Sequence, residues 1–139
     1  MATFNKFNSF IEAIFEKKHD FSSDVFKVML TNTLPVAANA VKADLTEITA
    51  ENGYTAGGTA ITISASSQTG GTYTAVISGD TVFTASGGTI GPFQYVAVYN
   101  DTATNDELVG WYEYVSPVTL QIAETFTFAG DGVNLISAS

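Results

Sequence analysis

Few residues in this sequence could carry out chemistry. It has a single histidine, His19, no cysteine, and five basic side chains that are all lysines. Without cysteine the chain forms no disulfide bond and no thiolate metal or redox centre. Without arginine it has no bidentate clamp for phosphate or carboxylate groups. A catalytic triad or a zinc site would have to be built around His19, which we expect instead to be exposed at the end of a helix.

Two polar or glycine-rich segments resemble ligand-binding loops only in part. Residues 100–107 collect three carboxylates and two amides, whose oxygens suit calcium. Their spacing is not that of an EF-hand, so we favour a polar hairpin loop and leave cation binding open. The glycine-rich residues 86–92 lack the lysine and the following helix of a phosphate loop. We therefore predict a wide turn there.

A third candidate combines aromatic rings with a carboxylate at Trp111, Tyr112, Glu113 and Tyr114. Strand alternation places Trp111 and Glu113 on one face and the two tyrosines on the other. Trp111 and Glu113 could form a surface patch that binds sugars, although a strand with one core face and one surface face is the preferred interpretation. Since no acid–base pair, nucleophile, metal cluster or cofactor motif stands out, we predict a protein that is not an enzyme and needs no cofactor.

The elements that must position these residues are mostly strands. Only 14% of the residues are charged, and threonine, serine and glycine are abundant, a composition typical of strands and tight turns. Glycines punctuate short runs rich in Val, Ile, Thr, Tyr and Phe, and Gln68–Gly71 and Asp131–Gly132 have the composition of hairpin turns. We predict a mainly β single domain over residues 1–139, with an antiparallel β-sandwich or jelly-roll-like barrel over residues 21–139. The candidate strands are residues 25–30, 59–65, 72–77, 81–85, 93–99, 108–115, 118–122, 124–128 and 133–136.

Residues 1–20 are predicted to form an N-terminal α-helix, because apolar residues recur there at helical spacing. Thr3 is a candidate N-cap, and Lys17, Lys18 and His19 would end the helix. The helix either packs on its own domain or docks on a neighbouring subunit. The candidate partner-contact residues on it are Phe4, Phe7, Phe10, Ile11 and Ile14.

Charge is distributed unevenly along the chain. The formal net charge is −9, and ten acidic residues but no basic residue follow Lys42. This acidic body would repel phosphates, so we expect no nucleic-acid partner. No apolar run suits a signal peptide or a membrane span, so we expect no membrane partner and a protein made and kept in a cytoplasm, or released from one by lysis. Residues 1–27, with four of the five lysines, are close to neutral.

Three stretches carry a family resemblance: residues 1–10, residues 52–58, and residues 86–100 running into 109–114. Together with residues 27–33 they resemble a family of small virion structural proteins of tailed bacteriophages, over residue 1 to about residue 128. The resemblance implies a capsid decoration (cement) protein, made in the cytoplasm of a host bacterium and placed on the capsid surface. Its implied partners are its own copies, as a dimer or trimer, and the major capsid protein. The alternatives are a tail component and a surface module that binds host glycans.

Overall fold

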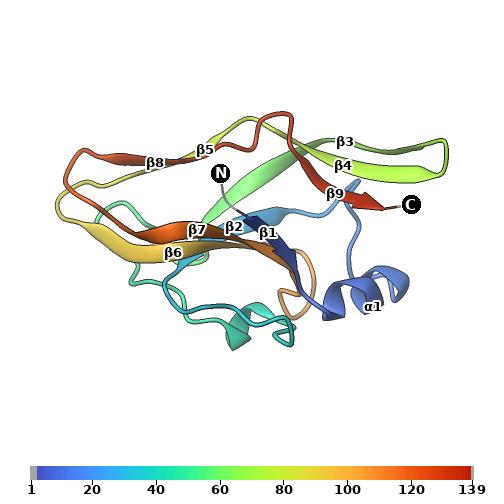
Figure 1. Cartoon of the computed structure of the whole chain (residues 1–139), viewed down its shortest axis with the longest axis horizontal. Coiled ribbons are helices and arrows are strands. Elements are labelled where there is room, and N and C mark those ends of the chain that lie inside the picture. Colours follow the sequence, from blue (N-terminus) through green and yellow to red (C-terminus); the bar gives the residue numbers. More distant parts are fainter. Residues whose placement is uncertain (1–2, 139) are drawn as a thin grey trace.

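Strands make up 49% of the chain and helices 7% in a computed structural model, which describes residues 3–138. Seven strands form one curled antiparallel sheet in the order β1-β7-β6-β2-β3-β4-β9, and β5 pairs with β8 in a second, two-stranded sheet (Figure 1). This confirms the predicted mainly β, antiparallel fold with a helix near the N-terminus. The strands are β1 (Thr3–Lys6), β2 (Phe26–Thr31), β3 (Thr59–Thr69), β4 (Thr72–Ser78), β5 (Thr81–Thr84), β6 (Ile90–Asn100), β7 (Leu108–Leu120), β8 (Thr125–Phe128) and β9 (Asn134–Ala138); the helices are α1 (Ser9–Phe15) and a 3-10 turn, η1 (Lys42–Asp44).

The main core lies between two layers of strands. Figure 1 shows β3, β4, β5, β8 and β9 lying over β2, β6 and β7. Alternate side chains of the lower layer, among them Phe26, Val28 and Leu30 of β2, point into this core and are fully buried. The alternation follows from the two-residue period of a strand, which sends successive side chains to opposite faces.

The opposite face of the lower layer is covered by the long connection over residues 32–58. Met29, Tyr99 and Trp111 are buried on that face in a second apolar cluster, against which Leu45 of the connection packs. The connection explains why β2 and β6 read as almost continuous apolar runs, since neither face of these strands meets water.

Polar contacts hold this connection against the sheet. One carboxylate oxygen of Glu47 accepts hydrogen bonds from the hydroxyl of Tyr54 and from the amide of Gly57, both at 2.7 Å. The amide of Leu30 donates to the Tyr54 hydroxyl at 3.0 Å, and the Tyr99 hydroxyl donates to the carbonyl of Gly57 at 2.6 Å. Residues 52–58, one of the stretches behind the family resemblance, therefore hold the long connection against the sheet through hydrogen bonds.

Two predicted features of the β region need correction. Residues 108–115 and 118–122 were expected as separate strands, but Leu108–Leu120 is one strand, β7. The hairpin at Gln68–Gly71 is confirmed, because Thr69 of β3 pairs with Thr72 of β4. The hairpin predicted at Asp131–Gly132 is wrong: β8 pairs with β5 and β9 pairs with β4. That turn instead carries the chain from the two-stranded sheet to the seven-stranded one.

The predicted helix over residues 1–20 is wrong in its extent. Residues Thr3–Lys6 form β1, antiparallel to β7, and α1 spans only Ser9–Phe15 with Asn8 at its N-cap position, so Thr3 is not the N-cap. The exposed edge of β7 offers main-chain hydrogen bonds to this segment, and the Phe4 ring packs 4.9 Å from the Tyr112 ring. Such tertiary contacts override local helix preference. Met1 and Ala2, where the predicted helix began, lie outside the described residues.

Candidate functional site

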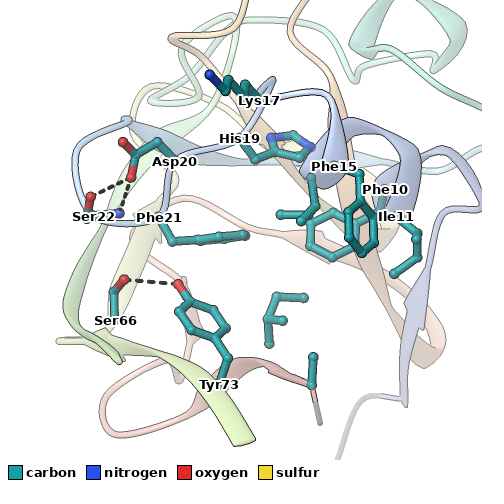
Figure 2. Close-up of a pocket in the computed structure, with 13 residues that line it drawn as sticks. Phe10, Ile11, Phe15, Lys17, His19, Asp20, Phe21, Ser22, Ser66 and Tyr73 are labelled. Atoms are coloured by element: carbon teal, nitrogen blue, oxygen red, sulfur yellow. Dashed lines mark hydrogen bonds between the residues drawn. The ribbon is translucent and has the colours of Figure 1, made fainter. Parts of the chain in front are cut away.

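An apolar groove of about 620 Å³ opens between α1 and the layer formed by β3, β4 and β9. We call it the α1 groove. Ile11 and Phe15 line it on the helix side, and Tyr73 of β4 and Ile136 and Ala138 of β9 line it on the strand side. Figure 2 shows Phe21 lying between these two walls, near His19 and Tyr73. Most of its lining is apolar, so the groove suits an apolar surface better than a polar small molecule.

The short helix α1 turns one face inward and leaves another free. Phe10 and Ala13 are buried beneath it. On its outer side Ile11 is 45% exposed and Phe15 is 83% exposed, although both have large apolar side chains. The burial of Phe10 and Ala13 fixes the helix on the body of the protein, so Phe15 is held out at the rim of the groove.

The floor of the groove is a stack of aromatic rings. The Phe10 ring stacks on the ring of His19 with centroids 5.4 Å apart, and Phe21 stacks on Phe26 at 4.5 Å with an interplanar angle of 3°. On the opposite wall the hydroxyls of Ser66 and Tyr73 are hydrogen-bonded at 3.0 Å (Figure 2). These contacts fix the shape of the groove in advance, so a partner would meet a formed surface.

The prediction that His19 is exposed at the end of a helix is wrong. Only 7% of the residue is exposed, because Lys17 adopts a left-handed backbone with φ of 63° and turns the chain back under α1. The side-chain amide of Asn100 donates a hydrogen bond to Nδ1 of His19 at 3.1 Å. Burial lowers the pKa of His19 below 6.5, although Glu107 and Asp24 nearby act in the opposite direction. His19 is therefore a neutral structural residue beneath the groove.

The five partner-contact candidates divide into two groups. Phe7 and Phe10 belong to the cores, and Phe4 packs on Tyr112, so these three are occupied within the chain. Ile11 and Ile14 line the groove, and the buried Phe10 lines it from the floor. The sequence-based choice missed Phe15, which is the most exposed aromatic side chain at the groove. The signal was present, because Phe15 extends the apolar stripe beyond the width that one core-facing helix needs.

The proposed sugar-binding pair is not a surface patch. Trp111 is only 7% exposed and lies against Phe7, with ring centroids 4.6 Å apart, beneath the long connection. Glu113 is exposed, while Tyr112 and Tyr114 pack against Phe128 and Phe126. The predicted alternation is therefore right, but both aromatic faces of the strand are used for packing, and Trp111 presents no ring to a sugar.

The two candidate loops act as connections. Residues 100–107 join β6 to β7, and the Asn100 amide donates to the carboxylate of Asp24 at 2.7 Å while Asp101 pairs with Lys27 at 3.1 Å. No group of three or more His, Asp or Glu side chains within residues 3–138 is arranged to hold a metal ion. The wide turn predicted over residues 86–92 is shorter, because β6 begins at Ile90. The side-chain amide of Asn52 donates to the carbonyl of Thr89 in this turn.

No protein-family model, curated protein or solved structure matches this chain. Among the described residues, no helix has the length and apolar character needed to cross a membrane.

Proposed function

We propose that this protein is a virion structural protein, a capsid decoration subunit of a tailed bacteriophage, which joins its neighbours through the α1 groove. The observation that carries the proposal is the exposed ring of Phe15, together with Ile11, at the rim of a formed apolar groove. Contiguous exposed apolar surface of this kind marks protein–protein contact sites, because water solvates it poorly.

The charge distribution supports the same surface. Residues 52–79, which include β3 and β4, contain no charged side chain, and neither do residues 133–138, which include β9. Four lysines balance four acidic residues in residues 3–27. The net charge of −9 therefore comes from the rest of the molecule. A partner that covers the uncharged strands on one side of the groove removes no charge from water there, which would be costly, while Lys17 and Asp20 line the helix side.

The resemblance to phage virion proteins supports the choice of a capsid over other assemblies. The residues behind it serve the fold: residues 52–58 hold the long connection, residues 86–100 contain all of β6, and residues 109–114 belong to the first half of β7. A decoration protein needs a rigid body and contact surfaces, and this use of its sequence fits that role. The major capsid protein and further copies of the chain are the proposed partners. Burial of Trp111 removes one of the two features that motivated a glycan-binding module, the other being the acidic loop over residues 100–107.

Quantitative mass spectrometry of purified virions of the encoding phage tests this function. A decoration protein should be present in hundreds of copies and should remain with heads when tails are removed. A few copies, or none, would contradict the proposal, and copies confined to tails would indicate a tail component.

A variant sharpens the test at the groove. Phe15→Ser removes the exposed ring without touching the core, so we expect the variant to fold and its occupancy on virions to fall at least several-fold. Val115→Ser is the matched control, because Val115 on β7 is 96% exposed and lies outside the groove. Equal occupancy of the wild type and both variants would show that assembly does not depend on the α1 groove.

A further inference from the structure

We propose that the neighbour at the α1 groove is a second copy of this chain, and that the β9 strands of the two copies pair antiparallel about a twofold axis. The inference rests on the proposed function, since it names the partner at the same surface. This pairing joins the curled sheets of the two copies into one continuous sheet, and both α1 helices lie at the junction.

The first argument is the edge of the sheet. β9 is the last strand of the seven-stranded order and pairs only with β4, from Tyr73↔Ala138 to Val76↔Asn134. Its outer edge therefore has no strand beside it among residues 3–138. Edge strands commonly carry lysine or proline, which discourage pairing with another chain. The sequence of β9, Asn-Leu-Ile-Ser-Ala, has neither, whereas β1 at the opposite edge carries Lys6.

The second argument is the shape beside that edge. A groove between an edge strand and a helix is the arrangement in which an added strand gains main-chain hydrogen bonds and places alternate side chains in the groove. Ile136 and Ala138 of β9 already face the groove from one wall, and Phe15 faces it from the other. A twofold axis perpendicular to the sheet sets both α1 helices on the same face. Each copy would then cover the exposed Phe15 ring of the other.

Charge favours a second copy over a strongly basic partner. Two molecules of charge −9 repel each other across their acidic surfaces. At this end the strands carry no charge, and the α1 region balances its acids internally, as in the pair between Lys18 and Glu16 at 3.5 Å. A strongly basic partner would find no carboxylate on β9 or β4 to pair with. A twofold contact sets the two uncharged β9 strands against each other, so their pairing brings no like charges together.

Sedimentation equilibrium of the purified full chain tests the inference, with circular dichroism to confirm that each variant folds. We expect the wild type at micromolar concentration to show twice the chain mass of 14.7 kDa. Ser137→Lys puts a lysine at an exposed position of β9 in each copy, where it discourages edge pairing, and should yield monomers. Phe15→Ser, on a different element, should weaken the dimer by about tenfold or more. Val115→Lys adds the same charge to an exposed strand position outside the groove and should leave the dimer intact.

A wild-type monomer at tens of micromolar, or a trimer, would overturn the inference. The inference would also be overturned if the dimer were as stable in the Ser137→Lys and Phe15→Ser variants as in the Val115→Lys variant. The two proposals fail separately. A monomer in solution that is abundant on heads overturns only the β9 dimer, and a dimer with the expected response to variants that is absent from virions overturns only the capsid role.

Discussion

At the scale of single residues, the Tyr54 hydroxyl joins the long connection to β2. It donates to Glu47 and accepts from the Leu30 amide, and burial together with the Glu47 carboxylate raises its pKa well above the usual value. Tyr54→Phe leaves the buried Leu30 amide without its hydrogen-bond partner and removes one of the two hydrogen bonds to the Glu47 oxygen, which keeps the Gly57 amide. We expect the free energy of unfolding to fall by about 1–3 kcal/mol in urea denaturation. Tyr73→Phe is the control, because its hydrogen bond to Ser66 lies at the groove surface. An equal loss in both variants would show that the hydrogen bonds of Tyr54 contribute no special stability to the long connection.

His19 predicts a dependence of stability on pH. Its pKa is lowered in the folded protein by burial, so the unfolded chain binds a proton more readily below the ordinary value of 6.5. The free energy of unfolding should therefore fall as the pH drops below 6.5, and His19→Gln should remove that part of the slope. The neighbouring charges are Asp24, Glu107 and Lys18, all retained in the variant. Identical slopes for wild type and variant between pH 6.5 and 5 would show that His19 does not titrate as its burial requires.

At the scale of elements, the close approach of residues 52–58 to β2 depends on Gly58. Gly58 has φ of +77°, and a Cβ there would lie 1.8 Å from the carbonyl oxygen of Val28. Gly58→Ala must displace backbone, so we expect a loss of more than about 3 kcal/mol in unfolding free energy. Gly79→Ala is the matched control, because Gly79 has φ of +80° with nothing within 4 Å. It should cost only about 1–2 kcal/mol of backbone strain. Similar losses in both would mean that the contact with Val28 relaxes easily.

The elements also show where sequence patterns stop being informative. The strands β2, β4 and β6 were predictable because their β-branched and aromatic residues alternate between turn signals. The segment at Phe4 and Phe7 fits helical spacing as well as it fits a strand followed by a helix, and only the free edge of β7 decides between them. Asp131–Gly132 has the composition of a hairpin turn, but the partner of β8 is β5, which lies far away in the sequence. Strand pairing of that kind leaves no local signal.

At the scale of the whole molecule, half of the candidate site was predictable. The apolar stripe and the balanced charges of the first residues indicated a contact surface there, and Ile11 and Ile14 do line the groove. The other wall comes from Tyr73, Ile136 and Ala138, which only the sheet order β3-β4-β9 brings beside α1. The burial of Trp111 was likewise not predictable from the sequence, because an irregular connection without sequence periodicity packs over its cluster.

We propose that the neutral end of the molecule is buried against neighbouring subunits in the assembled virion, and trypsin tests this burial directly. Every lysine lies at or before Lys42, and Lys17 lines the α1 groove. Cleavage rates after Lys17 and Lys18 should be compared in purified virions and in free protein diluted to the monomer, with peptides read by mass spectrometry. We expect cleavage at both sites to be at least tenfold slower in virions. If virions that retain the protein are cleaved at the same rate as the free protein, this end of the molecule is not buried in the virion.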